Sequence, residues 1–310
     1  MKNKIKGTLF LMITALLWGT SFVAQKSGMD TMGPITFMCL RSLVGAVVLL
    51  PIALVYGRMS HGREESGNEG STEQIKGWKL IFTGMLCGIA YLGASLFQQY
   101  GMWLGTTAGK SAFITALYIV ITPVIGVLFK KKLSAKNWIC VAVAAFGMYL
   151  LCINGEVSLQ IGDLMTLLCA ICFSIHIIVI DRYASRCNCV LLSCIQFFFS
   201  GLLALIPMLV IEKPTAEIIM DTAFQVLYLG ICSNGIAYTF QMFGQRDLEP
   251  SPASLIMSLE SVFAAVSGWL ILNEKMSGKE IIGCVFIAIA IVFAQVKIQF
   301  NSKKLQKSEK

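Results

Sequence analysis

The fold of this chain is constrained most by long runs without charge, of which Ser111–Phe129 is the clearest. These nineteen residues carry no charged side chain, and three lysines, Lys130–Lys132, follow them directly. At 1.5 Å per residue, a helix of this length spans about 28 Å, close to the ~30 Å hydrocarbon core of a lipid bilayer. The run therefore predicts a membrane-spanning helix that ends at a cluster of cations.

Nine further apolar runs are long enough, or nearly so, to cross a bilayer as helices. The ten runs cover residues 5–24, 35–56, 80–100, 111–129, 133–153, 161–180, 190–211, 224–243, 253–272 and 281–298. Hydrophobic residues make up 56% of the chain and charged residues only 14%, which is too apolar for a soluble domain. We expect an all-α membrane protein with ten transmembrane helices, in which residues 5–24 form the first span rather than a signal peptide.

The positive charges predict the topology of these spans. The net charge is +8, but the basic residues lie between apolar runs, so nucleic-acid binding is not expected. Cytoplasmic loops of membrane proteins collect Lys and Arg. Ten spans with the amino terminus inside place nineteen of these residues on the cytoplasmic side and five on the other. We therefore expect both termini in the cytoplasm, with residues 298–310 as a basic cytoplasmic tail.

The two halves of the chain resemble each other when one is shifted along the other. A shift of 143 residues aligns Phe97 with Phe240, Gln98 with Gln241, Gly101 with Gly244, Ser111 with Ser254, Lys132 with Lys275 and Ala145 with Ala288. Because five spans per copy is an odd number, the second copy must enter the membrane from the opposite side. We predict two inverted five-helix repeats, residues 7–153 and 161–297, a plan of secondary transporters that places the substrate between the copies.

Six of the expected spans carry a polar stripe, in which polar or aromatic side chains recur every three or four residues on one helical face. Spans one, three and four correspond in this respect to spans six, eight and nine. The candidate substrate-binding residues are Trp18, Ser21, Gln25, Tyr91, Gln98, Ser111, Thr115, Tyr118, His176, Asn234, Tyr238, Gln241, Ser258 and Ser261. Six such helices would enclose a polar, aromatic-lined cavity suited to a small molecule. The alternative is that these side chains only join helices, through hydrogen bonds of ~0.6 kcal/mol each.

Two charged residues lie well inside expected spans, where a charge costs about 2.5–3.5 kcal/mol even on a lenient scale. Glu260 adjoins the polar stripe of the ninth span, and Arg41 lies within the second. Glu260 could exchange a proton or bind a substrate amine; alternatively, it forms a structural hydrogen bond or pairs with Arg41. Arg41 could also extend toward the membrane surface. His176 could relay protons, or it could be a hydrogen-bonded histidine of the cavity.

No cofactor is expected from the sequence. Most of the eleven cysteines lie inside apolar runs, where we expect them to pack rather than to form disulfides. Cys169, Cys172 and His176 share a helical face, but the sequence shows no fourth ligand for a metal. Pro123 frees a backbone carbonyl inside the fourth span and predicts a kink there.

Three phrases of the chain resemble the EamA-type drug/metabolite transporter family. They are Leu17–Phe22, Thr106–Thr115 and Leu270–Glu274, and the resemblance extends over residues 7–297. It implies a plasma-membrane carrier, often an exporter, of small metabolites such as amino acids. By this resemblance Trp18-Gly19 match the Trp-Gly of the first span, Arg41 matches the arginine of the second, and Glu274 matches the acid that closes the ninth. Family members often have Leu-Glu-Pro where this chain has Leu259-Glu260-Ser261.

The sequence therefore predicts a secondary transporter of small metabolites, with the lipid bilayer as its environment and alternating access as its mechanism. A membrane-embedded enzyme is not expected, because no paired carboxylates, His-rich motif or Ser-His-Asp set is evident. A structural or sensory membrane protein that transports nothing remains the alternative. The fifth and tenth spans are apolar nearly all round and could support a homodimer.

Overall fold

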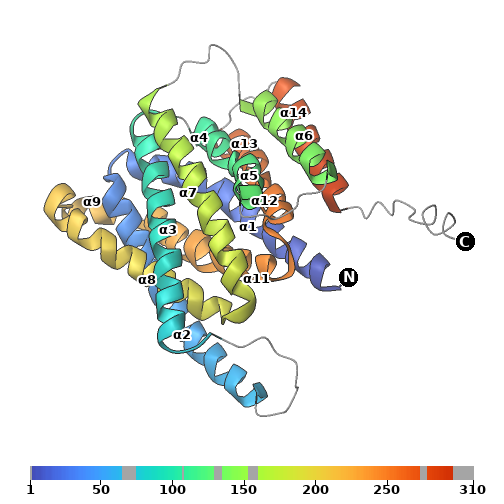
Figure 1. The fold of residues 1–310 in the computed structure, drawn as a ribbon. Helices are drawn as coiled ribbons and strands as arrows, with labels where there is room; N and C mark the ends of the chain where they lie inside the picture. Colours follow the sequence, from blue (N-terminus) through green and yellow to red (C-terminus); the bar gives the residue numbers. More distant parts are fainter. Residues whose placement is uncertain are drawn as a thin grey trace, which may run out of the picture.

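The computed structural model describes residues 2–64, 75–106, 108–128, 135–152, 160–272 and 278–295. Within these ranges every regular element is helical (Figure 1), as expected where no water can satisfy the backbone. The first half contains α1 (Lys2–Met29), α2 (Pro34–Glu64), α3 (Trp78–Trp103), α4 (Ala108–Ala116), α5 (Tyr118–Leu128) and α6 (Ala135–Cys152). The second half contains α7 (Ile161–Tyr183), η1 (Ala184–Arg186), α8 (Cys189–Pro207), η2 (Met208–Glu212), α9 (Ala216–Asp221), α10 (Ala223–Tyr228), η3 (Leu229–Ala237), α11 (Tyr238–Asp247), α12 (Pro250–Met257), α13 (Leu259–Leu272) and α14 (Gly278–Gln295).

Seven helical segments in the described ranges are long and apolar enough to cross a membrane. They are Lys4–Met29, Pro34–Val55, Trp78–Trp103, Ala108–Leu128, Ile161–Arg186, Cys189–Glu212 and Pro250–Ile271. Two shorter apolar helices, Ala135–Gly147 and Ile281–Phe293, occupy the places of the expected fifth and tenth spans. The expected eighth span is divided among α10, η3 and α11. The protein is thus an all-helical, multi-pass membrane protein, and the count of ten spans stays a prediction.

Parts of the topology argument lie outside the described residues. These are Lys130–Lys132, Glu274, residues 65–74 of the polar segment 57–77 and the tail 298–310. The placement of both termini in the cytoplasm therefore also stays a prediction.

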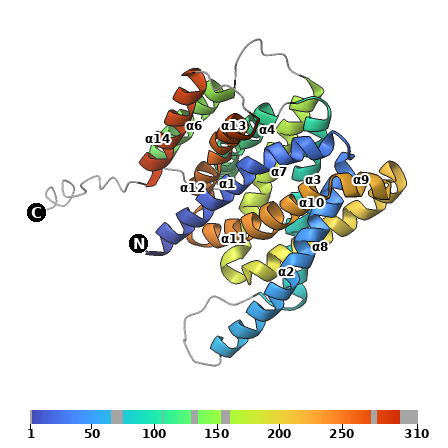
Figure 2. The ribbon, with the colours of Figure 1, turned by 180° about the vertical axis from the view of Figure 1, so that it is seen from behind.

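Helices of the two halves pack against each other reciprocally. α2 runs along α8, and α6 runs along α14 at one side of the bundle (Figures 1 and 2). α3 packs on α7, while α1 packs on α11 and η3. α4 also contacts α7, and α13 contacts α1. Each of these contacts between the halves thus has a counterpart in which the roles of the halves are exchanged. An inverted repeat would produce this pattern.

The tryptophans fall into two groups, four exposed residues near helix ends and one buried residue inside the bundle. Trp78, Trp103, Trp138 and Trp269 lie near helix ends, and all four are exposed, Trp78 most of all at 77%. Exposed aromatic residues at both ends of spans are typical of the interfacial belts of membrane proteins. Trp18, in contrast, is only 8% exposed. Its indole therefore belongs to the interior of the bundle.

Two equivalent helix crossings depend on glycine. Where α3 crosses α7, a Cβ on Gly101 would overlap Thr166 and lie 2.8 Å from the Gly162 carbonyl oxygen. Where α11 crosses α1, a Cβ on Gly244 would lie 2.5 Å from Leu11 Cγ and 3.0 Å from the Gly7 carbonyl oxygen. Small residues let transmembrane helices approach this closely.

The α3–α7 crossing gives a stability prediction. Replacing Gly101 with alanine forces an overlap that costs about 1–3 kcal/mol, as overpacking of cores does. We expect Gly101→Ala to lower the apparent melting temperature in lipid nanodiscs. Gly93→Ala on the same helix is the matched control, because its nearest neighbour would be Cys172 Sγ at 3.8 Å. Equal melting temperatures for the two variants would contradict the close crossing.

Cys187 allows a chemical test of the expectation that the cysteines pack rather than react. It lies between α7 and α8, where burial raises the pKa of its thiol from 9.0 to about 11. Only the thiolate is alkylated, so the maleimide rate at Cys187 should rise about tenfold per pH unit up to pH 10. An exposed cysteine, made by Lys79→Cys, should level off earlier. Levelling off of the Cys187 rate below pH 9.5 would contradict the burial.

Candidate functional site

A cavity of about 430 Å³, counting its open mouth, lies where both halves of the bundle meet. Ten candidate residues from the sequence line it: Trp18, Ser21, Gln25, Arg41, Gln98, Thr115, Tyr118, Tyr238, Gln241 and Glu260. They come from α1, α2, α3, α4, α5, α11 and α13. The structure therefore brings most of the predicted stripes to one place, while the role of each residue in binding stays a prediction.

Aromatic rings form one wall of the cavity. The Trp18 ring lies 4.7 Å from the Tyr238 ring and 6.5 Å from the Phe173 ring, measured between centroids. Trp18 Nε1 is buried without a hydrogen-bond partner, and an indole N–H can only donate. This wall therefore offers aromatic faces together with one free donor.

Glu260 enters the cavity next to an irregular turn. α12 ends at Met257 and α13 begins at Leu259, and between them Ser258 Oγ donates to the Leu255 carbonyl oxygen at 2.7 Å. α1 can approach this point because residue 19 is glycine: a Cβ there would lie 2.8 Å from the Glu260 carbonyl oxygen and would overlap Phe263. Gly19 therefore allows Trp18 and Glu260 to line the same space.

Tyr118 enters the cavity from the first half, also next to an interrupted helix. The fourth span is interrupted at Leu117, between α4 and α5. Tyr118 interacts electrostatically with Glu260. The Tyr118 hydroxyl and Glu260 Oε1 are nevertheless buried without a hydrogen-bond partner. The irregularity of this span thus lies at Leu117, whereas Pro123, at which a kink was expected, lies inside α5.

Arg41 is held in the cavity by Gln25, which is itself bonded by Gln99. Gln25 Oε1 accepts from Arg41 Nη1 at 3.1 Å and from Gln99 Nε2 at 2.8 Å. Two donors on one atom identify that atom as the amide oxygen. The NH₂ group of Gln25 is then left as a donor beside the guanidinium. Arg41 Nε is also buried without a partner, so this part of the cavity is rich in donors.

Arg41 and Glu260 line the same cavity without pairing with each other. No ion pair joins them in the described part of the chain. The expected alternative, in which Glu260 neutralises Arg41 directly, is therefore not what the structure shows. Both side chains are buried and neither pairs with the other, although burial of an unpaired charge is costly.

Tyr91 and Asn234 join the two halves at the centre of the bundle. The Tyr91 hydroxyl donates to Asn234 Oδ1 at 2.9 Å. These residues are 143 positions apart, the shift that aligns the halves. Asn234 Nδ2 also donates to the Arg41 carbonyl oxygen at 3.2 Å, and the Arg41 guanidinium lies 5.9 Å from the centre of the Tyr91 ring. Neither Tyr91 nor Asn234 lines the cavity; they support Arg41 from behind.

Four other candidates are also buried outside the cavity wall. His176 Nε2 lies 3.2 Å from Gln196 Oε1, so it is a hydrogen-bonded histidine behind the wall. Ser258 and Ser261 bond to backbone carbonyls, the latter to Ala112 at 3.3 Å, and Ser111 Oγ has no partner. In the described residues, no group of three His, Cys, Asp or Glu side chains is placed to hold a metal ion.

Sequence reasoning missed four lining residues and one supporting residue. The lining residues are Phe22, Phe173, Ile177 and Ser233, and the supporting residue is Gln99. Phe22 and Phe173 are counterparts in the two halves, a signal that could have identified them. Ser233 lies in the π-helix η3, whose wider turn breaks the 3.6-residue period. π-helical segments are frequent at functional sites.

The Tyr91–Asn234 bond gives a testable cost. Tyr91→Phe leaves the buried Asn234 Oδ1 without its donor, which costs about 1–3 kcal/mol. We expect a lower apparent melting temperature in nanodiscs. Tyr149→Phe, at a side chain 51% exposed, is the control and should change little. If Tyr91→Phe were as stable as this control, the central bond would not contribute to the fold.

Comparison with known proteins gives a separate match to each half of the chain. The sequence model of the EamA-like transporter family matches residues 5–153 and again 160–295. An uncharacterized transporter of Archaeoglobus fulgidus is 27% identical over 96% of this chain and 88% of its own length. One from Clostridium kluyveri is 25% identical over 96% and 94%. A protein of known crystal structure superposes with a TM-score of 0.73 at 17% identity, over 98% of this chain and 99% of its own, which shows a shared fold.

Proposed function

The chain belongs to the EamA-like transporter family, and from this premise we propose that it carries small zwitterionic metabolites, such as amino acids, out of the cell across the plasma membrane. The observation that carries the proposal is the unpaired placement of Arg41 and Glu260 in one cavity. A solute with both an anionic and a cationic group would pair with both residues at once. Its binding would relieve the cost of keeping the two charges buried apart.

The anionic end of the solute fits the part of the cavity around Arg41. Arg41 Nε is a buried donor without an acceptor there, and the Gln25 NH₂ group is a second donor beside the guanidinium. Guanidinium groups recognise carboxylates through paired, charge-assisted hydrogen bonds. The supporting contacts from Gln99 and Asn234 hold the arginine in place before the solute arrives.

The cationic end fits the part around Glu260 and the aromatic wall. Glu260 Oε1 has no hydrogen-bond partner, and it can accept from an ammonium group. The ring faces of Trp18 and Tyr238 attract cations through their negative faces. The amine and the carboxylate of the solute would therefore bind to different helices. This arrangement favours a small metabolite over a bare ion.

Alternating access is the proposed mechanism. The proposal is supported by a cavity that both halves line and by equivalent close helix crossings, at Gly101 in one half and at Gly244 in the other. Rocking of one half against the other about Tyr91 and Asn234 would expose the cavity to one side at a time. The export direction rests on family resemblance alone.

A flux assay in proteoliposomes tests the transport proposal. A panel of labelled L-amino acids should yield at least one that is taken up. Arg41→Gln should raise its KM about ten- to a hundredfold, because a hydrogen bond to a charged group contributes about 1.5–3 kcal/mol. Ile89→Ala, at a side chain 50% exposed on α3, is the control. Absence of flux across amino acids and a broad metabolite panel would favour the structural or sensory alternative.

Proton coupling through Glu260 is a separate part of the proposal. Glu260 is the only acid among the described residues that line the cavity, and it could bind a proton and a substrate amine in turn. Glu260→Gln keeps the size of the side chain but cannot ionise. We expect wild-type flux to change with an imposed pH gradient and flux through Glu260→Gln to become insensitive to it. Unchanged pH dependence in the variant would exclude this coupling while leaving transport itself intact.

A further inference from the structure

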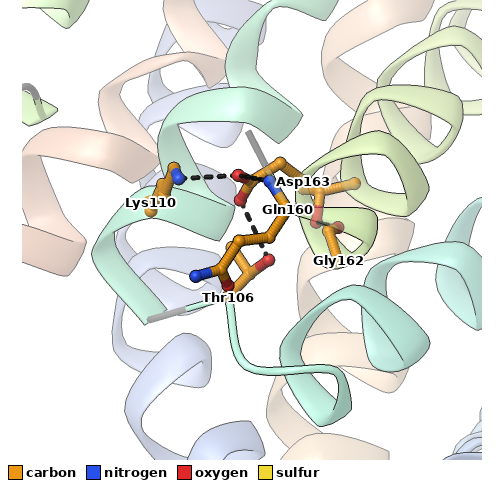
Figure 3. Close-up of polar contacts among 6 residues, drawn as sticks. Thr106, Lys110, Gln160, Gly162 and Asp163 are labelled. Carbon is orange, nitrogen blue, oxygen red and sulfur yellow. Dashed lines mark hydrogen bonds and ion pairs between the residues drawn. The ribbon is translucent and has the colours of Figure 1, made fainter. Parts of the chain in front are cut away.

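A charged contact links the two halves away from the cavity. Lys110 Nζ lies 2.6 Å from Asp163 Oδ2 (Figure 3). Lys110 is in the first turn of α4, and Asp163 is in the first turn of α7. The side chain of Asp163 is only 2% exposed, whereas that of Lys110 is 33% exposed. The pair therefore joins the first half to the second through a buried carboxylate.

The carboxylate of Asp163 is bound from three directions. Besides Lys110, Thr106 Oγ1 donates to Asp163 Oδ1 at 3.1 Å, and the Gln160 backbone N–H donates to Oδ2 at 2.9 Å (Figure 3). Thr106 belongs to the short connection between α3 and α4. The contact from Gln160 is local to α7, but those from Thr106 and Lys110 come from the other half. Asp163 thus fastens this connection and the start of α4 to α7.

The same end of the bundle is closed by apolar side chains. A buried cluster that includes Phe22, Met29, Met102 and Ala112 brings together the ends of α1 and α3 and the start of α4. Phe22 also lines the cavity. The cluster therefore continues from the cavity toward the end where Lys110 and Asp163 meet. In the expected topology this end is external.

The opposite end repeats the helix crossing but not the charges. Gly244 meets Gly7 there as Gly101 meets Gly162. The positions that correspond to Lys110 and Thr106, 143 residues later, are Ala253 and Glu249. The residue after Gly7 is Thr8, where Asp163 follows Gly162. An ion pair between these counterparts is impossible, so the two ends are closed by different means.

We propose that Lys110 and Asp163 form a latch that keeps the cavity closed at its external end and that breaks whenever the cavity opens there. This inference rests on the alternating access proposed above. α4 must separate from α7 if the external ends of the two halves part, and the pair is the charged link across that seam. At the opposite end, the counterparts of these residues, Ala253 and Thr8, cannot form such a pair.

Access to the cavity from outside tests the latch without a substrate. The reporter is Ser21→Cys, a cavity residue only 1% exposed, in a background in which Cys172, Cys232 and Cys284, the half-buried cysteines, are serine. Intact cells are treated with a membrane-impermeant thiosulfonate. Lys110→Gln and Asp163→Asn should each raise the labelling rate at least about fivefold, the lower bound of typical coupling between two states.

Two further variants separate a latch from general loosening. The exchange Lys110→Asp with Asp163→Lys restores opposite charges and should return labelling toward the wild-type rate. Lys26→Gln removes another ion pair, Lys26–Asp30, whose side chains are 43% and 68% exposed, and should change nothing. Hydrogen exchange in nanodiscs should quicken at residues 104–112 and 161–165 in the single variants and stay unchanged at residues 5–10 and 243–248.

The outcomes distinguish the latch from the transport proposal. Labelling that stays slow in both single variants, or that the charge exchange fails to restore, would overturn the latch even if the flux assay shows transport. Faster labelling that appears only with reagent on the cytoplasmic side would also overturn it. Failure of flux with fast labelling in the single variants would reject the transport proposal and leave the latch as a closure of the cavity.

Discussion

In hydrocarbon every polar group must find its partner inside the protein, and this constraint organises the whole bundle. The six striped helices turn their polar faces inward because lipid offers no hydrogen bonds. Where equivalent helices meet at the centre, Tyr91 and Asn234 satisfy each other directly. At the cavity, Gln241 Oε1, Trp18 Nε1 and Glu260 Oε1 remain without partners. A polar solute in the cavity would supply hydrogen-bond partners for these atoms.

The two halves are similar in packing but different in charge. Both close their ends with facing glycines, at Gly101 and at Gly244. Only the first half contributes Arg41 to the cavity, and only the second contributes Glu260. A symmetric scaffold with asymmetric charges can bind a solute in a defined orientation while still opening toward either side. The Lys110–Asp163 pair adds a second asymmetry, because the counterparts of its two residues, Ala253 and Thr8, cannot form an ion pair.

Much of the candidate site could be predicted from periodicity, because a stripe of polar residues in a membrane must face protein. The stripes could not show how each helix is rotated about its axis, which decides whether a residue lines the cavity or lies behind it. Gln98 and Gln99 illustrate this: Gln98 lines the cavity, while its neighbour, outside the predicted stripe, orients Gln25. Phe22, Phe173 and Ile177 were missed because an apolar lining residue resembles any core residue. The π-helix η3, which places Ser233 at the wall, follows from packing rather than from local sequence.

Distance measurements between spin labels at the two ends of the bundle test alternating access most directly. Trp103 and Leu270 are exposed at one end, and their counterparts 143 positions away in the repeat, Arg246 and Val127, are exposed at the other. In nanodiscs, alternating access predicts a short and a long distance for each pair, Trp103–Leu270 at one end and Arg246–Val127 at the other. The fraction of molecules with the long distance at one end should equal the fraction with the short distance at the other end. Lys110→Gln should raise the long-distance fraction of the Trp103–Leu270 pair and lower that of the Arg246–Val127 pair. A single unchanged distance at each end, in wild type and variant alike, would contradict the account.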